Sequence, residues 1–197
     1  MAFDIFPENV FKQLTNSELT VDEKAKLIEC ILTTLRNTKS LSSKFKEIQS
    51  FLEFTFAWID KIDENLTTKF IGVVKYMVDI DLISKQDTWD WIFTTSSKHL
   101  GSSIIDIRQE WMRLFIALMK TMNKKSYLSR WIECLNSNNW RIREEMLNLI
   151  IISILNKIDQ DFDYKSLISA LAKLVNDDNK KVRFVTHETL ALLALKG

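Results

Sequence analysis

The sequence predicts an all-α solenoid built from about five stacked helical hairpins, and three observations support this prediction. The 197 residues include only three glycines and one proline, too few for a fold that depends on tight turns. Apolar residues recur at steps of three and four, as on one face of a helix. The stretch "NSNNWRIREE" at 136–145 is matched position for position by "NDDNKKVRFV" at 176–185, so a unit of about forty residues repeats. A period in this range, with two helices per unit, is typical of HEAT and armadillo repeats.

Each hairpin is expected to contain a first and a second helix, and weaker copies of the repeat extend the pattern toward the N-terminus. The predicted first helices lie near residues 6–16, 44–61, 87–100, 126–136 and 163–176. The predicted second helices lie near residues 21–37, 65–83, 104–122, 140–157 and 180–195.

Capping residues and apolar stripes support these elements in chain order. Thr20 followed by Glu23 forms a capping box, which starts the second helix of the first hairpin. Asn139 and Asn179 are good N-caps for the last two second helices, each stabilising its helix by about 1 kcal/mol. The clearest apolar stripes consist of Ile107, Trp111, Leu114, Phe115 and Leu118, and of Ile142, Met146, Leu149 and Ile150. These faces should bury against neighbouring hairpins.

Composition and charge exclude several classes of function. The chain is 46% hydrophobic and 27% charged, as in a globular protein, and its net charge is +1. A general nucleic-acid or membrane binder needs a large surface of one sign, so neither partner is expected. No apolar run approaches the roughly 20 residues of a membrane span. Cys30 and Cys134 each lie in an apolar helical pattern, which favours a reducing compartment over a disulfide framework.

No catalytic or metal-binding set emerges from the sequence, so we expect neither an enzyme nor a cofactor. His99 and His187 lie in different hairpins without Asp, Glu or Cys at metal-ligand spacing, and we expect both on helix surfaces. No glycine-rich phosphate loop or nucleophile elbow occurs. Five tryptophans fall within helices and are expected to pack between layers: Trp58, Trp89, Trp91, Trp111 and Trp131.

The loops between the two helices of each hairpin are the predicted binding surface. In a solenoid such loops emerge along one edge, so five loop tips should form one ridge. Arg143 and Arg183 lie inside the first helical turn, and we expect them to bond neighbouring loop carbonyls or acids. Candidate contact residues at the tips are Leu19, Val21, Glu64, Leu66, Thr67, Ser102, Ser103, Asn138, Trp140, Arg141, Asn179, Lys180 and Lys181.

These tips suit an acidic protein partner, with Trp140 as an anchor and Arg141 as a bidentate donor. The alternative interpretation is that they are soluble turn residues, with Trp140 folded back on its neighbour. Basic loops could also meet RNA or DNA, but the tips have no run of positive charges.

Four stretches resemble the TOG domains of the crescerin family, with CLASP TOG domains next: "FDIFPENVFKQL", "IRQEWM", "NWRIREEMLNL" and "DFDYKSLISALAKLVNDDNKKVRFVTHETLALLA". The resemblance implies a single TOG-like domain over 1–197, possibly one of several in a longer protein. It implies a monomeric, rigid paddle that binds the tubulin heterodimer or the microtubule lattice through its loop edge. It also implies a protein of the cytoplasm and cytoskeleton that regulates microtubules of cilia and axonemes.

Two departures from the TOG pattern leave an alternative open. Many TOG domains have a tryptophan in the first loop, whereas "LTVDEK" here places Val21 nearest that position and Lys24 near the usual basic one. TOG domains also usually contain six hairpins, and five are predicted here. A HEAT-repeat scaffold that binds another protein without binding tubulin is therefore the second hypothesis.

Overall fold

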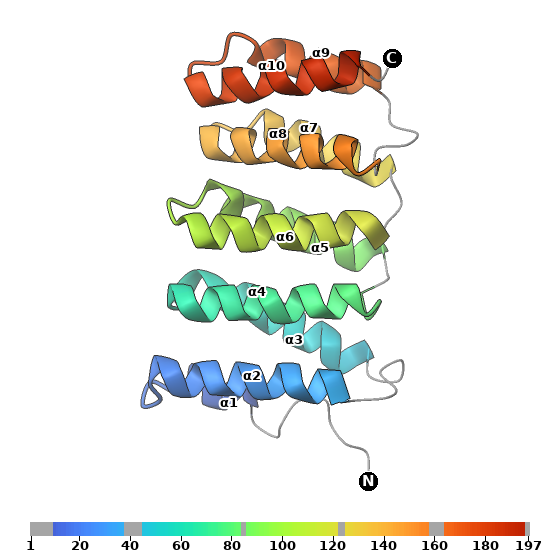
Figure 1. The fold of residues 1–197 in the computed structure, drawn as a ribbon. Helices are drawn as coiled ribbons and strands as arrows, with labels where there is room; N and C mark the ends of the chain where they lie inside the picture. Colours follow the sequence, from blue (N-terminus) through green and yellow to red (C-terminus); the bar gives the residue numbers. More distant parts are fainter. Residues whose placement is uncertain (1–9, 38–44, 84–85, 122–124, 158–163, 196–197) are drawn as a thin grey trace. The chain divides into compact units, whose positions relative to one another are not determined.

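The computed structural model describes residues 10–37, 45–83, 86–121, 125–157 and 164–195, and in these ranges every regular element is a helix. The α-helices are α1 Val10–Thr15, α2 Val21–Asn37, α3 Phe45–Trp58, α4 Glu64–Asp79, α5 Gln86–Ser96, α6 Ile105–Thr121, α7 Lys125–Leu135, α8 Trp140–Leu155, α9 Tyr164–Leu174 and α10 Lys180–Ala194 (Figure 1). Two 3-10 helical turns, η2 Ile59–Lys61 and η3 Ser97–Gly101, extend α3 and α5. The predicted all-α fold of helical hairpins is confirmed.

The predicted helix boundaries agree with the structure to within a few residues. The main difference is at α4, which was expected to reach residue 83 but ends at Asp79. Asp81 adopts a left-handed conformation with φ of 59°, and its amide donates to the Val78 carbonyl at 2.9 Å. This local reversal ends the helix because a left-handed residue cannot continue it. Predicted helical positions 6–9, 44, 122 and 163 lie outside the described residues.

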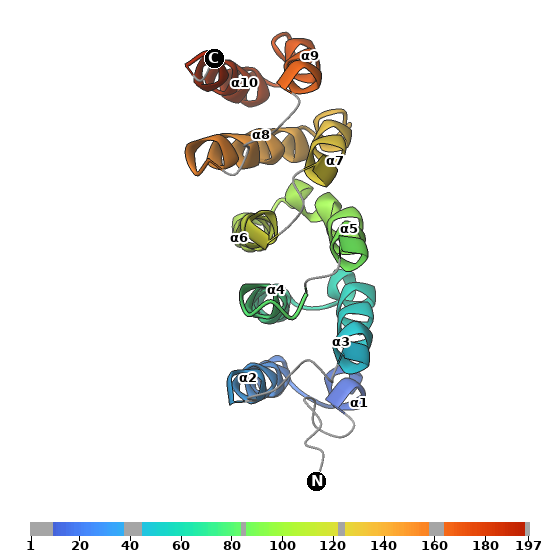
Figure 2. The same cartoon turned by 90° about the vertical axis from the view of Figure 1, so that its right-hand side faces the viewer.

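The chain forms two compact units, Met1–Ile83 and Ser84–Gly197, which we describe separately and call unit 1 and unit 2. A single domain over 1–197 stays a prediction. In unit 1, α2 packs along α4, and α1 packs on α2 (Figure 2). The core of unit 1 is aromatic: Phe51 of α3 is fully buried, and its ring centroid lies 6.1 Å from that of Phe70 of α4.

In unit 2 the three second helices pack in chain order, α6 on α8 and α8 on α10, while α5, α7 and α9 form the parallel layer of first helices (Figure 2). Both predicted apolar stripes face this core, except for Ile142, which is half-buried. Trp89, Trp111 and Trp131 are fully buried as predicted. Trp91 is half-buried, so its predicted core position is only partly correct.

Candidate functional site

In unit 2 each first helix is joined to its second helix at the same end of the stack. The three loops cover residues 102–104, 136–139 and 175–179, and they lie together at the left in Figure 1. We call these loops, with the first turns of α6, α8 and α10 that follow them, the loop edge of unit 2. The sequence predicted that such loops share an edge, and within unit 2 they do.

Three arginines hold these loops, and each donates to the backbone carbonyl six residues before it. The pairs are Arg108 with Ser102 at 2.6 Å, Arg143 with Ser137 at 2.7 Å, and Arg183 with Asp177 at 2.6 Å. The structural roles predicted for Arg143 and Arg183 are confirmed.

Two of these arginines also reach an acid in the following hairpin. Arg108 Nε lies 3.0 Å from Glu145 Oε1 in α8. Arg143 forms a bidentate pair with Asp177, with Nε–Oδ2 at 2.7 Å and Nη2–Oδ1 at 2.8 Å. We call this series of contacts the arginine ladder. Sequence analysis did not identify the two acids, although each follows its arginine by 34 or 37 residues, close to one repeat.

Asp177 is the most strongly held acid of the arginine ladder, with a side chain only 5% exposed. Burial by itself raises the pKa of this carboxyl. The hydrogen bonds from Arg143 and from the Asn179 amide, together with the charges of Arg143 and Arg183, outweigh burial and lower the pKa overall. Asp177 is therefore ionised near neutral pH and fixes the start of α10.

Asn139 links the second loop of the edge to the first. Its Oδ1 accepts from the Arg141 amide at 3.0 Å, which confirms the predicted N-cap of α8. Its Nδ2 donates to the Gly101 carbonyl at 3.4 Å. A Cβ atom on Gly101 would lie 2.3 Å from that Nδ2, so only glycine permits this approach. Asn179 caps α10 in the same way, as predicted.

We expect Gly101→Ala to lower the free energy of unfolding by about 1–2 kcal/mol, because the added methyl group displaces Asn139 and weakens the cap of α8. Urea denaturation followed by circular dichroism measures this difference. Gly72→Ala is the control, since a Cβ atom there meets nothing within 4 Å. Equal stability of Gly101→Ala and the natural chain would show that Asn139 can move without loss.

Trp140 is the centre of a cationic cluster at the loop edge of unit 2. The ring is half-buried, with the Arg141 guanidinium carbon 4.6 Å and Lys181 Nζ 5.5 Å from its centroid. Trp140 thus contacts cations from two successive hairpins. Its contact with Arg141 matches the alternative in which the ring folds back on its neighbour, whereas the sequence did not indicate the contact with Lys181. Lys180 and Lys181 are exposed.

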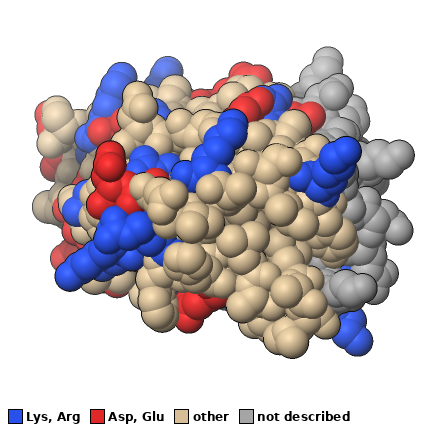
Figure 3. Space-filling model, turned by 90° about the horizontal axis from the view of Figure 1, so that it is seen from above, with Lys and Arg blue, Asp and Glu red and all other residues tan. Residues whose placement is uncertain are grey.

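Acidic groups accompany these cations. Burial raises the pKa of Glu144, although the charge of Lys181 opposes that shift. In Figure 3 several Lys and Arg side chains lie toward the left end of the face, the end at which the loops of unit 2 lie in Figure 1, with acids among them, and others lie near the middle and right. The edge offers closely spaced cations to a partner.

The remaining predicted tip residues of unit 2 lie in its loops. Ser103 and Asn138 are exposed. Ser102 is half-buried, and its hydroxyl accepts from the Ile104 amide at 3.2 Å, so it shapes the loop. The convergence of all five loops of the chain on one ridge stays a prediction.

In unit 1 the first loop leads into the predicted capping box, which is confirmed. The Thr20 amide donates to Glu23 Oε2 at 2.8 Å, and the Glu23 amide donates to Thr20 Oγ1 at 3.2 Å. The Glu23 carboxylate accepts hydrogen bonds from the Thr20 amide and the Thr20 hydroxyl, and these two bonds lower its pKa. Leu19 is half-buried, whereas Val21 is 40% exposed.

Two predicted contact residues of unit 1 are corrected by the structure. Leu66 and Thr67 are only 2% and 4% exposed, because both lie in the first turn of α4, which begins at Glu64 after the Asp63 cap. Leu66 therefore faces the core, and the Thr67 hydroxyl donates to the Asp63 carbonyl at 3.1 Å. Neither side chain is available at the surface, while Glu64 at the helix start is exposed.

Beside the start of α2 in unit 1 lies an aromatic ring from the second hairpin. Lys24 Nζ is 5.8 Å from the centroid of Trp58, which is half-buried rather than in the core as predicted. Trp58 also meets Phe70 edge to face at 5.8 Å. An indole therefore lies near the first turn of α2, the helix that begins with Val21.

The two histidines differ from each other. His187 is exposed, as predicted, but His99 stacks on Trp111 with centroids 4.9 Å apart and planes 5° apart, so its predicted surface position is wrong. Among the described residues no group of three or more His, Cys, Asp or Glu side chains could hold a metal ion. The helices in the described ranges include none long and apolar enough to cross a membrane.

Comparisons with known proteins point to one family, although no known family model matches the chain. The chain is 25% identical over 194 residues to the "TOG array regulator of axonemal microtubules protein 1" of Mus musculus and of Homo sapiens, which covers 98% of this chain and 11% of each relative. It is 30% identical over 98 residues to "Crescerin-like protein che-12" of Caenorhabditis elegans, which covers 50% of this chain and 8% of that protein. The chain thus spans only a small part of these relatives.

Solved structures agree with these relatives. A crescerin structure, described as using "a TOG domain array to regulate microtubules in the primary cilium", superposes with a TM-score of 0.81 at 26% identity, covering 99% of this chain and 79% of the other. The MAST/Orbit N-terminal domain gives a TM-score of 0.76 at 16% identity, covering 96% and 84%, which shows the shared fold alone. The fold is the HEAT-repeat fold of a TOG domain, and the homologues of this chain are crescerin-type proteins.

Proposed function

We propose that this chain, a homologue of the crescerin TOG domains, binds the tubulin heterodimer through the loop edge of unit 2 and so regulates microtubules in cilia. The observation that carries the proposal is the cluster in which Trp140 holds Arg141 and Lys181 at 4.6 and 5.5 Å. The names of the relatives support microtubules as the context. The place of action is then the cytoplasm and its cytoskeleton, including the axoneme.

The physical basis is a preformed cationic surface on rigid helices. The arginine ladder fixes the loops before a partner arrives, so little conformational entropy is lost on binding. Arg141 can donate two parallel hydrogen bonds to a carboxylate, and the exposed lysines add long-range attraction for acidic surfaces. The site binds and orients its partner, and it carries out no reaction and uses no cofactor.

A second candidate function, a HEAT-repeat scaffold that does not bind tubulin, is favoured by Val21. This side chain is small and only 40% exposed, so it offers less contact area than an indole. The nearby Trp58 and Lys24 supply an aromatic and a basic group from another direction. Binding of tubulin to the purified chain distinguishes the two candidates.

We expect the double variant Lys180→Glu with Lys181→Glu to bind tubulin heterodimer at least tenfold more weakly, because each reversal places an acid opposite an acidic partner. Co-elution on size-exclusion chromatography and a titration with labelled tubulin measure the loss. Helical content should stay unchanged, because both side chains are exposed.

The matched control is Lys120→Glu with Lys165→Glu, which reverses two exposed charges at the other end of α6 and α9. This control should bind as the natural chain does. Binding should weaken as salt is added, because exposed charges are screened over about 10 Å at 0.1 M. An equal loss of tubulin affinity in both double variants would show that only net charge matters. Undiminished binding by Lys180→Glu with Lys181→Glu would show that these two lysines do not contact tubulin. No tubulin binding by the natural chain would favour the scaffold.

A further inference from the structure

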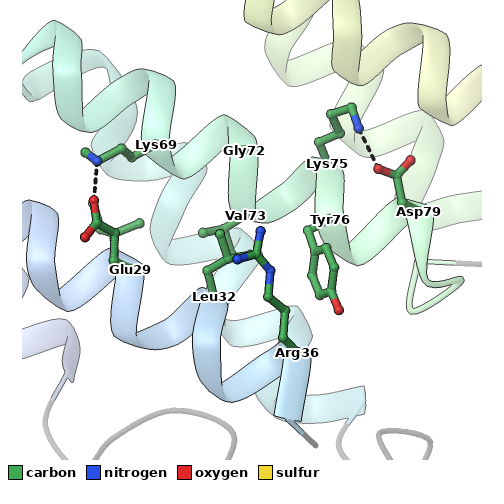
Figure 4. Close-up of a pocket in the computed structure, with 10 residues that line it drawn as sticks. Glu29, Leu32, Arg36, Lys69, Gly72, Val73, Lys75, Tyr76 and Asp79 are labelled. Atoms are coloured by element: carbon green, nitrogen blue, oxygen red, sulfur yellow. Dashed lines mark hydrogen bonds and ion pairs between the residues drawn. The ribbon is translucent and has the colours of Figure 1, made fainter.

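Unit 1 contains a groove of about 500 Å³ between α2 and α4, on the face formed by the second helices (Figure 4). Its floor combines Leu32 from α2 with Gly72 and Val73 from α4. The groove runs from the middle of the two helices to their C-terminal ends, away from the loops that begin them. Its volume is within the range of pockets that take a small ligand or a few side chains.

Ion pairs neutralise both ends of this groove. At one end Lys69 Nζ lies 2.5 Å from Glu29 Oε1, which links α4 to α2. At the other end Lys75 Nζ lies 2.5 Å from Asp79 Oδ2, one turn along α4. Both acids lining the groove are therefore engaged by lysines, so neither offsets the charge at its centre (Figure 4).

Arg36 supplies that central charge. Its guanidinium extends from α2 toward Gly72 and Val73, with its carbon 5.6 Å from the centroid of Tyr76 (Figure 4). Within the described part of the chain, this guanidinium makes no hydrogen bond or ion pair. The Tyr76 hydroxyl likewise has no hydrogen-bond partner there. The Arg36 guanidinium and the Tyr76 hydroxyl thus line one groove beside its apolar floor. Neither group has a hydrogen-bond acceptor in the described part of the chain.

Gly72 leaves space beside these donors. A Cβ atom at this position would meet nothing within 4 Å, although α4 would be more stable with almost any other non-proline residue there. The glycine therefore opens the floor of the groove. An aliphatic side chain from outside could contact Leu32 and Val73 at this point, next to the Arg36 guanidinium.

We propose that this groove binds an acidic peptide segment of a partner protein, with an aliphatic side chain over Gly72 and the carboxylate of an adjacent Asp or Glu on Arg36 and Tyr76. The planar guanidinium matches a carboxylate through two parallel hydrogen bonds. The apolar floor selects a peptide side chain over a bare inorganic anion. This site is separate from the loop edge of unit 2, and the inference does not depend on tubulin binding.

The test uses the blocked tetrapeptide acetyl-Ala-Leu-Glu-Ala-amide as the probe, with acetyl-Ala-Leu-Gln-Ala-amide as its neutral match. The readout is the amide resonance of Gly72 in ¹⁵N spectra of the full chain, because the sequence contains only three glycines and their amides are readily assigned. We expect the acidic probe to shift Gly72 but not Gly101. The neutral probe should bind about tenfold more weakly, because it lacks the charge-assisted hydrogen bonds between the glutamate carboxylate and Arg36.

Two variants locate the two halves of the site. Arg36→Gln should reduce binding of the acidic probe to the level of the neutral probe, whereas Arg113→Gln, at an exposed arginine of α6, should leave both unchanged. Gly72→Leu should block both probes without lowering the melting temperature, since its Cβ position is open.

The proposal fails if Gly72 does not respond to the acidic probe, or if Arg36→Gln keeps the preference for glutamate over glutamine. If the double variant Lys180→Glu with Lys181→Glu binds the acidic probe with the same affinity as the natural chain, the groove and the loop edge are independent sites. Loss of probe binding in that double variant would instead assign the probe to the loop edge and overturn the proposal.

Discussion

Arg143→Ala is expected to lower the free energy of unfolding by about 3–5 kcal/mol, which places it among the most damaging substitutions in unit 2. The Arg143 and Asp177 side chains are only 13% and 5% exposed, so removing one partner leaves a nearly buried carboxylate without its counter-charge. The Ser137 carbonyl loses its donor as well. Chemical denaturation at neutral pH measures the loss.

Arg113→Ala is the control for this measurement, because Arg113 pairs with Glu110 on the surface of α6 and its side chain is 59% exposed. An exposed pair of this kind contributes at most about 1 kcal/mol. Similar losses in the two variants would contradict the special role of the arginine ladder.

Acid pH provides a second check on the same pair. The pKa of Asp177 is lowered in the folded protein, so its ionised form stabilises the fold above its unfolded-state pKa of about 3.9. That stabilisation is lost as the pH falls through the lower folded-state pKa. The difference in stability between the natural chain and Arg143→Ala should therefore be full at neutral pH and shrink below about pH 4. A difference that stays constant in acid would assign it to packing instead.

Trp111→Ala is expected to lower the free energy of unfolding by about 3–5 kcal/mol, because it removes a fully buried indole and leaves a cavity. The ring contacts His99 and lies 6.1 Å from Phe115 between centroids, so several elements lose packing at once. Thermal unfolding followed by circular dichroism measures the change.

Trp140→Ala is the informative comparison, since this half-buried indole lies at the loop edge. We expect a small change in melting temperature and a loss of about 1–3 kcal/mol in tubulin binding free energy. A large drop in melting temperature with unchanged binding would place Trp140 among the core residues and leave the basic residues alone as the contact.

Much of the fold could be predicted because local signals and long-range packing agree. The scarcity of glycine and proline and the repeated apolar stripes indicated helices, while Asn139 and Asn179 marked where two of them begin. Arg143 and Arg183 could be assigned structural roles because their position relative to the aliphatic stripe repeats from hairpin to hairpin.

The site was predicted less completely because side-chain neighbours depend on contacts between hairpins. Leu66 was named as a loop-tip contact although its predicted helix began near residue 65, because the packing of α2 on α4 decides which side of the first turn is buried. The pairing of Asp177 with Arg143 needs the exact register of adjacent hairpins. Likewise, the meeting of Arg36 with Tyr76 joins residues of two hairpins, and no local pattern in the sequence indicates it.

The arginine ladder has a mechanical consequence for unit 2. Arg108 and Arg143 each bond both the loop before them and an acid of the next hairpin, so a displacement of one loop is transmitted to the next hairpin. The loops of this edge are therefore expected to move together. We therefore expect changes at two of these loops to combine non-additively in their effect on the stability of unit 2.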